Sequence, residues 1–294
     1  MEEPYNQTEN DINGARICNC TTQLVWKSPA VWDEVTLTVQ WVVFSTALPG
    51  LCYAAWRLYA LAQPDHVAPV YTINLLLSDL IQISANPIYT TLRVVTCYCD
   101  AAAVMLKIYE FGVLGNICFM VCISAERYIM TAHPVWYISI NRISTAVLAS
   151  TIIWLLSAAL MIVRHIYVSL SLTLDYILGV ILLLPCPLVT LLLAGTWRAL
   201  SRTSIPRADQ RRVIGTLVLV LCIYVVSFLP YILALVLYYM LQPLHQGFWV
   251  HLFDSCEILI ALNPLFDLLL YVFMRRGAEG ICRSHSFCVR EDSD

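Results

Sequence analysis

The chain has 294 residues, of which 60% are hydrophobic and only 13% are charged, and its formal net charge is −3. Soluble domains carry about 25% charged residues, so this composition excludes an ordinary soluble protein. The small net charge gives no reason to expect a nucleic acid as partner. The informative feature is the set of long apolar runs, because a helix of about 20 apolar residues crosses a membrane.

Seven such runs predict an all-α bundle of seven transmembrane helices. They are too uniformly apolar for the alternating strands of a membrane barrel. They define one transmembrane domain over 35–276, between an N-terminal segment over 1–34 and a tail over 277–294. We expect the spans at about 35–56, 67–92, 101–125, 143–163, 176–197, 213–240 and 249–274.

Lysine and arginine are distributed unevenly between the two sides of these spans. Since cytosolic loops are enriched in both residues, the richer side should face the cytosol. This places the N-terminus outside the cell and the C-terminus inside, as an odd number of spans requires. The poorer side holds Arg16, Lys27, Arg93, Lys107 and Arg164, and the richer side holds Arg57, Arg127, Arg142, Arg198, Arg202, Arg207, Arg211, Arg212, Arg275, Arg276, Arg283 and Arg290.

Short motifs recur at fixed places in the spans. The second span contains NLLLSDL over 74–80 and the third ends in ERY over 126–128. The fourth contains Trp154, the sixth contains FLPY over 228–231, and the seventh contains NPLFDLLLY over 263–271. Together, in this order, the motifs resemble those of rhodopsin-type (class A) G-protein-coupled receptors. The last two are similar to those of the purinergic and lipid receptor branch, and the stretch over 65–82 resembles proton-sensing and lysolipid receptors.

The resemblance implies a multi-pass plasma-membrane receptor, surrounded by membrane lipids, that signals to a heterotrimeric G protein. Its ligand would be an extracellular small molecule, a lipid, a nucleotide-like anion or protons. Glu126, Arg127 and Tyr128 would form the ionic lock and the G-protein contact, although an arginine there could also simply extend to lipid phosphate. The resemblance also implies an activation switch formed by Phe228, Pro230 and Tyr271.

Polar residues inside the spans form a second group of candidates. Acidic residues in a membrane are costly and usually functional, and the chain has Asp79 and Asp267 there, with Asn116 and Asn263. They form either a hydrogen-bonded clamp with a shared proton or, as the resemblance implies, a sodium site. We expect no other cofactor, no other metal site and no catalytic residues.

The outer third of the third span provides candidates for a ligand pocket. Lys107, Tyr109 and Glu110 lie on a stretch that lines the ligand pocket in the resembled family. Lys107 and Glu110 are three residues apart, so they could instead neutralise each other. Arg93, at the outer end of the second span, is a candidate for holding an anionic headgroup because arginine suits phosphate and carboxylate.

The sequence also departs from the family pattern. Leu51 replaces an asparagine, Leu268 a proline, Gly195 a tyrosine and Ala102 a cysteine. A receptor-like protein that no longer signals is therefore an alternative function. A membrane enzyme would need clustered metal ligands or a nucleophile with its base, and a transporter would need inverted halves; the sequence favours neither.

Several residues are candidates for covalent modification. Asn6 and Asn19 stand in glycosylation sequons on the expected outer side. The resembled branch implies a disulfide from Cys18 or Cys20 to Cys256, with Cys97 or Cys99 available for the other N-terminal cysteine. These outer cysteines are odd in number, so one should stay unpaired or bond elsewhere. Cys282 and Cys288 follow the last span and are candidates for palmitoylation.

Overall fold

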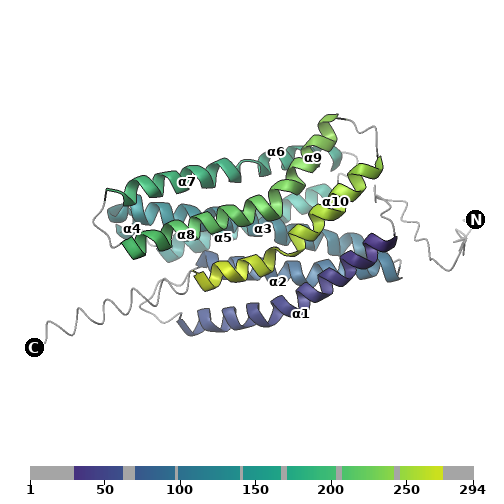
Figure 1. Ribbon diagram of the computed structural model, residues 1–294, viewed down its shortest axis with the longest axis horizontal. Coiled ribbons are helices and arrows are strands. Elements are labelled where there is room, and N and C mark those ends of the chain that lie inside the picture. Colours follow the sequence, from purple (N-terminus) through teal and green to yellow (C-terminus); the bar gives the residue numbers. More distant parts are fainter. Residues whose placement is uncertain are drawn as a thin grey trace, which may run out of the picture.

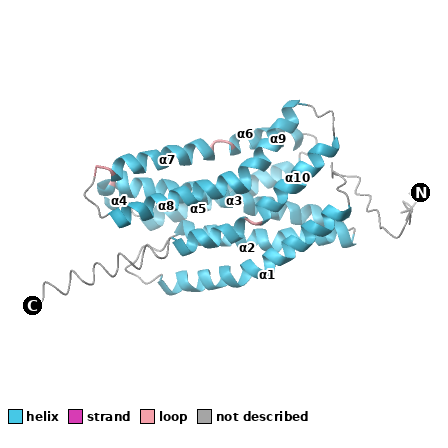
Figure 2. Cartoon of the chain, viewed as in Figure 1, coloured by secondary structure: helices cyan, strands magenta, loops and turns pink. Residues whose placement is uncertain are grey.

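The computed structural model describes residues 30–61, 70–96, 99–139, 142–166, 171–202, 207–241 and 246–273. In these ranges every regular element is helical, and the long helices run side by side along one common axis (Figures 1 and 2). This confirms the all-α bundle predicted from the sequence. The predicted tail and most of the predicted N-terminal segment lie outside the described residues.

The helices correspond to the seven predicted spans. The first four spans are α1, α2 with the π-helical turn η1, α3, and α5. The fifth is α6 followed by α7, the sixth is α8, the π-helical turn η3 and α9, and the seventh is α10 followed by helix over 263–273. A short helix, α4, was not expected. The bounds are α1 Ala30–Leu61, α2 Val70–Thr91, η1 Leu92–Thr96, α3 Cys99–Ala132, α4 Pro134–Ser139, α5 Arg142–Ile166, α6 Ser171–Leu182, α7 Pro185–Leu200, α8 Arg207–Ile223, η3 Tyr224–Phe228, α9 Leu229–Leu241 and α10 Gln246–Ala261.

Helix α2 differs from the other six spans, which are long and apolar enough to cross a membrane on composition alone. It packs against α1 on one side and α3 on the other. Its buried face is polar, which lowers its hydropathy although the helix is inside the bundle. The buried polar residues of this face are Thr72, Ser78, Asp79, Gln82, Asn86 and Thr90.

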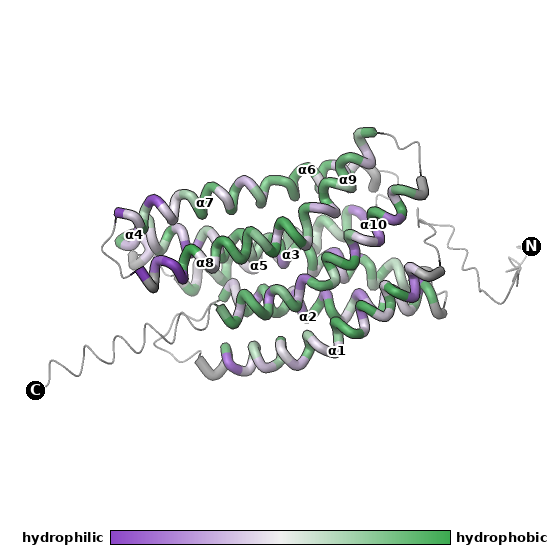
Figure 3. The backbone as a smooth tube through the Cα atoms, viewed as in Figure 1, coloured by the Kyte–Doolittle hydropathy of each residue, from purple (hydrophilic) through white to green (hydrophobic). Residues whose placement is uncertain are grey.

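The long helices consist largely of hydrophobic residues (Figure 3), and many of their large apolar side chains are exposed, as contact with lipid requires. Leu155 and Leu156 on α5 are 65% and 66% exposed, and Leu191 on α7 is 70% exposed. Many polar side chains in the spans are buried, and exposed ones such as Thr151 and Thr190 donate to a carbonyl of their own helix, since lipid offers them no hydrogen bonds. The bundle therefore places its polar chemistry between the helices.

Two helix breaks face each other near the middle of the bundle. Helix α6 ends at Leu182, because Pro185 has no N–H to continue the helical ladder. The opposite break is η3, which ends at Phe228, two residues before Pro230 of α9. The Tyr224 hydroxyl on η3 donates a hydrogen bond to the Leu182 carbonyl. This bond joins the fifth and sixth spans at their irregular points.

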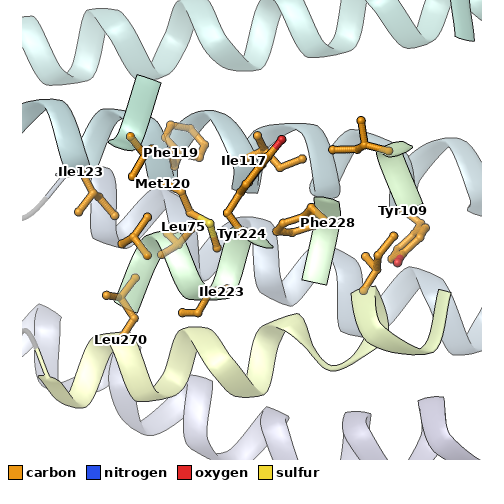
Figure 4. Packing of buried hydrophobic residues seen from close by; sticks show 14 of the residues in the cluster. Leu75, Tyr109, Ile117, Phe119, Met120, Ile123, Ile223, Tyr224, Phe228 and Leu270 are labelled. Carbon is orange, nitrogen blue, oxygen red and sulfur yellow. The ribbon is translucent and has the colours of Figure 1, made fainter. Parts of the chain in front are cut away.

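A packed apolar core surrounds these breaks (Figure 4). Tyr224 and Phe228 are each 1% exposed, with ring centroids 6.1 Å apart. On the other side of α3, the Trp154 ring lies over Gly115, where an added Cβ would be 3.0 Å from it. The Trp154 indole N–H donates to Asn74 Oδ1 at 2.8 Å. The core thereby fixes α2, α3 and α5 around the mid-bundle polar groups.

Candidate functional site

The structure brings together the four intramembrane polar residues singled out from the sequence. Asp79 of α2, Asn116 of α3 and Asn263 are 0% exposed, and Asp267 is 1% exposed. Asn116 Nδ2 donates to Asp79 Oδ1 at 2.7 Å and to Asp267 Oδ2 at 2.9 Å. Asn263 Nδ2 donates to Asp267 Oδ2 at 2.8 Å. We call these four residues the acid cluster.

The acid cluster retains unused oxygens. The Asp79 and Asp267 carboxyl groups both accept from the same Asn116 side-chain nitrogen, and two buried carboxylates this close together need a shared proton or a cation between them. One side-chain oxygen of each of the four residues receives no hydrogen bond from the described part of the chain. A set of carboxylate and amide oxygens suits a hard cation, so these residues fit sodium. The unused oxygens are Asp79 Oδ2, Asp267 Oδ1, Asn116 Oδ1 and Asn263 Oδ1.

The expected ionic lock has a different arrangement in the structure. Glu126 and Arg127 form no ion pair with each other within 4.0 Å, although both are described. Glu126 Oε1 instead accepts a hydrogen bond from the Tyr137 hydroxyl of α4 at 3.3 Å. Arg127 Nε is buried without a hydrogen-bond partner among the described residues. The Tyr128 ring lies against Gly195 of α7, where an added Cβ would be 2.6 Å from it.

The three residues of the expected activation switch do not all lie together in the structure. Phe228 belongs to the core around η3, and Pro230 follows it at the start of α9. Tyr271 is 6% exposed and packs in another apolar cluster, with Leu51 of α1 and Leu76 of α2. The structure therefore places this tyrosine between the first, second and seventh spans, not beside Phe228.

The Arg93 side chain already interacts with other residues of the chain. Its Nη2 lies 2.8 Å from Asp33 Oδ1 of α1. Its Nη1 donates to the Tyr89 hydroxyl at 3.2 Å, and its guanidinium lies 5.4 Å from the centroid of the Tyr89 ring. These contacts occupy the groups that were expected to hold an anionic headgroup.

The charged residues of α3 are likewise paired. Lys107 Nζ lies 3.0 Å from Glu110 Oε2, which is the neutralising arrangement. The same carboxylate receives Arg164 Nη1 of α5 at 2.7 Å, and Arg164 Nη2 reaches Asp175 of α6 at 2.5 Å. Because Arg164 is only 10% exposed, its two carboxylates compensate a largely buried charge. We call Lys107, Glu110, Arg164 and Asp175 the outer ion network.

A small cavity lined by both apolar and polar residues lies between α1, α2, α3 and the seventh span. Its free volume of about 10 Å³ is room for about one water molecule. Gln40, Gln82 and Asn86 line it and are 2–3% exposed, yet each has a side-chain atom without a hydrogen-bond partner among the described residues. Tyr109 also lines the cavity, and its hydroxyl has no hydrogen-bond partner in the described ranges.

The sequence reasoning missed the three amide residues of this cavity. A signal was present, because Gln82 and Asn86 follow Asp79 at helical spacing on one face of α2. Tyr109 was expected in a ligand pocket, and Figure 4 shows it at the opposite end of the packed core from Ile123.

The candidates for covalent modification lie mostly where the structure gives no description. Asn6, Asn19, Cys18, Cys20, Cys97, Cys282 and Cys288 lie outside the described residues, as does the side chain of Cys99. Cys256 is 3% exposed and has a free thiol in the structure. The N-terminal disulfide, glycosylation and palmitoylation therefore stay predictions.

Comparison with known proteins gives relatives but no match to a family model. Proteinase-activated receptor 2 of Rattus norvegicus is 26% identical over 279 residues, covering 84% of this chain and 70% of its own length. The C5a anaphylatoxin chemotactic receptor 1 of Oryctolagus cuniculus is 22% identical, covering 85% and 79%. A purinoceptor of Gallus gallus is 28% identical over 126 residues, covering 42% and 35%.

The bundle, its ordered motifs and these relatives define the class. The chain is a rhodopsin-type G-protein-coupled receptor, a multi-pass protein of the plasma membrane and not an enzyme. It is a divergent member, similar over most of its length to proteinase-activated receptor 2 and to the C5a receptor.

Proposed function

We propose that this receptor binds its ligand at the end of the bundle that carries Arg93 and Tyr109, and couples to a heterotrimeric G protein at the end that carries Arg127. The N-terminus is then extracellular and the C-terminus cytosolic. The asymmetry of positive charge carries this proposal. Arg198 lies in the last turn of α7, Arg202 follows that helix, and Arg207, Arg211 and Arg212 begin α8, at the same end as α4 (Figure 1). Such clusters face the cytosol in membrane proteins.

At the ligand end lie the cavity, to which Tyr109 belongs, and the ion pairs of Arg93, Lys107 and Arg164. The relatives are named for a proteinase, for C5a and for purines, so their names do not select one ligand for this chain. The contacts argue against the anionic ligand expected from the sequence, because Arg93, Lys107 and Arg164 each already have a carboxylate partner. An anion would have to displace these carboxylates.

The acid cluster lies between the two ends and is suited to couple them. Asp79 and Asp267, with Asn116 and Asn263, would hold a sodium ion, which neutralises the buried carboxylates. A cation that prefers the closed bundle stabilises the inactive receptor by linkage. A ligand that prefers the open bundle shifts the population toward the state that binds the G protein.

The coupling end is tested by replacing Arg127. Membranes that contain the receptor and one G protein of each class are assayed for basal guanine-nucleotide exchange. Arg127→Ala should abolish receptor-stimulated exchange at equal surface expression, whereas Arg198→Ala, an exposed arginine at the same end, should retain it. Equal exchange by wild type and Arg127→Ala would contradict this role, and no exchange by the wild type with any class would favour the receptor that no longer signals.

Orientation needs a separate measurement. An epitope tag at the N-terminus should be stained on intact cells, and a tag at the C-terminus only after permeabilisation. Staining of the C-terminal tag on intact cells would reverse the assignment of the two ends.

A further inference from the structure

The halves of the fifth and sixth spans at the coupling end, α7 and α8, are each separated from the other half of their span by a helix break. Helix α7 follows the break between Leu182 and Pro185, and α8 ends at the π-helical turn η3, close to Pro230. Interruptions of this kind are the points at which a helix bends. The Tyr224 hydroxyl joins the two breaks through the Leu182 carbonyl, so α7 and α8 have neighbouring hinges.

The two helices are also joined to each other at the end far from these hinges. Gln210 Nε2, in the first turn of α8, donates a hydrogen bond to the carbonyl of Leu200, the last residue of α7, at 3.1 Å. The carbonyls of a last helical turn have no partner within their own helix, so this bond meets a need of α7. The helices pack against each other, and both reach the end that carries α4 (Figure 1). We call α7 and α8 together the α7–α8 arm, because they should move as one unit.

The seventh span contacts the α7–α8 arm at a glycine of α8. Phe273, the last residue of the helix over 263–273, places its ring on Gly215. A Cβ added at Gly215 would lie 2.8 Å from Phe273 Cζ and 2.9 Å from Cε1. Carbon atoms in ordinary contact are about 3.5–4.0 Å apart, so the ring fits there only because Gly215 has no side chain. Phe273 is 39% exposed, so the ring lies at the rim of the bundle, where it can separate from the glycine.

The third span contacts the arm in the same way at a glycine of α7. The Tyr128 ring lies on Gly195, where an added Cβ would be 2.6 Å from Tyr128 Cε2. Each contact thus seats an aromatic ring from a neighbouring span on a glycine of the arm, beyond the hinges. Glycine inside a helix is less stable than alanine, so Gly195 and Gly215 are better explained by the rings they receive than by helix formation.

We propose that Phe273 and Tyr128 form a latch that holds the α7–α8 arm closed against the third and seventh spans. A swing of the arm away from these spans takes Gly215 and Gly195 from under the rings, so the two contacts belong to the closed arrangement alone. Contacts that are made in one of two states bias the equilibrium toward that state. The proposal rests on the proposed function for assigning the closed arrangement to the inactive receptor, and it names the regulation of the coupling end.

The test measures the position of the arm in the purified full-length receptor and needs no G protein. The ketone amino acid p-acetylphenylalanine replaces Ile73, near the start of α2, and Arg211 of α8, which are both exposed. Nitroxides attached to the ketones leave the native cysteines unlabelled, and double electron–electron resonance gives the ratio of open to closed arms. Gly215→Ala and Gly195→Ala should each raise this ratio by roughly fivefold or more, because the new methyl group overpacks the contact with the ring.

A compensating change distinguishes a latch from a general loss of packing. Phe273→Leu removes the ring atoms that meet the new methyl group, so the double variant with Gly215→Ala should have a ratio roughly threefold or more below that of Gly215→Ala alone. Gly179→Ala is the matched control, because its Cβ would lie 3.1 Å from Val236 Cγ2 of α9, on the other side of the hinges, and its ratio should equal that of the wild type. An unchanged ratio in both Gly215→Ala and Gly195→Ala would overturn the proposal, and so would an equal increase in Gly179→Ala.

Phe273→Ala provides a second measurement should Gly215→Ala fail to fold. It removes the ring and adds no atom, so it should also raise the ratio, and a wild-type ratio in this variant would refute the latch. Basal guanine-nucleotide exchange is then measured with the unlabelled Gly215→Ala receptor and should exceed that of the wild type. A more open arm without increased exchange would support the latch and contradict the proposed coupling, so failure of the latch and failure of the proposed function are distinct results.

Discussion

Removal of one carboxylate from the acid cluster should abolish a response of the receptor to sodium. Asp79→Asn is the suitable change, because the amide keeps an oxygen where Asp79 Oδ1 accepts from Asn116 at 2.7 Å. It places an N–H where Oδ2 is unused, and that N–H can donate to Asp267. The variant should therefore fold with the cluster satisfied, while it loses the negative charge that a cation requires.

The size of the sodium effect follows from linkage. Above its Kd, each tenfold increase in sodium should stabilise the folded wild type by about 1.4 kcal/mol. For a chain of this size, 1 kcal/mol corresponds to about 2 °C in melting temperature, so each tenfold step should raise the Tm by about 3 °C. Asp79→Asn should show no rise.

The assay is thermal unfolding of the purified receptor at constant ionic strength, with N-methylglucamine replacing sodium. Asp100→Asn, the same substitution at an exposed site on α3, should keep the sodium response of the wild type. Acidification should weaken that response in the wild type, because protons compete with sodium for the same carboxylate oxygens.

One result would refute the cation site. If the Tm of the wild type does not change with sodium at any pH, the two acids share a proton and act as a clamp between α2 and the seventh span. The coupled carboxyl groups would then titrate as a pair, and Asp79→Asn would resemble the wild type in every buffer.

Two further changes test contacts that hold the spans together, both measured as melting temperature of the purified receptor. Arg164→Gln should destabilise the fold by about 2 kcal/mol, between the values for exposed and buried pairs, because it removes the ion-pair partner of Asp175 and leaves Glu110 with Lys107 alone. A melting temperature equal to that of the wild type would mean that the Arg164 ion pairs contribute nothing to stability. Tyr224→Phe should cost about 1 kcal/mol through loss of the hydrogen bond to the Leu182 carbonyl, and an unchanged melting temperature would show that this bond has no net value.

The spans could be predicted from the sequence because each consists of a long apolar run. The structure extends several of them, for example α3 to Ala132 where the apolar run ends near Ala125. Helices continue past the hydrocarbon because their backbone bonds are satisfied internally. Helix α4 was not predicted, since Pro134–Ser139 is too short to show a periodic pattern.

The contacts between spans were predictable only where a motif indicated them. The acid cluster was expected as a group, and its members lie within hydrogen-bond distance. Arg164 and Glu110 are 54 residues apart, so nothing in the sequence pairs them. The place of Gln40 in the cavity likewise depends on how far α1 is shifted along α2. The spacing of residues within one helix does not determine that shift.

The departures from the family pattern bear on whether this receptor signals, and the structure accounts for three of them by substitute contacts. Leu268, in place of a proline, packs against Gly50, where an added Cβ would be 2.6 Å from it. Gly195, in place of a tyrosine, leaves the space that the Tyr128 ring fills.

The third departure is the missing outer disulfide. Ala102, in place of the cysteine on α3, is 4% exposed in the packed bundle. The outer ion network instead joins α3 to α5 and α6 through Glu110, Arg164 and Asp175. Ion pairs between helices are weaker than a disulfide bond, but they can break and re-form as the helices move. A chain that had merely lost its function would be expected to accumulate cavities and unpaired charges at these positions. The replacement contacts therefore favour a receptor that signals with altered parts over one that no longer signals.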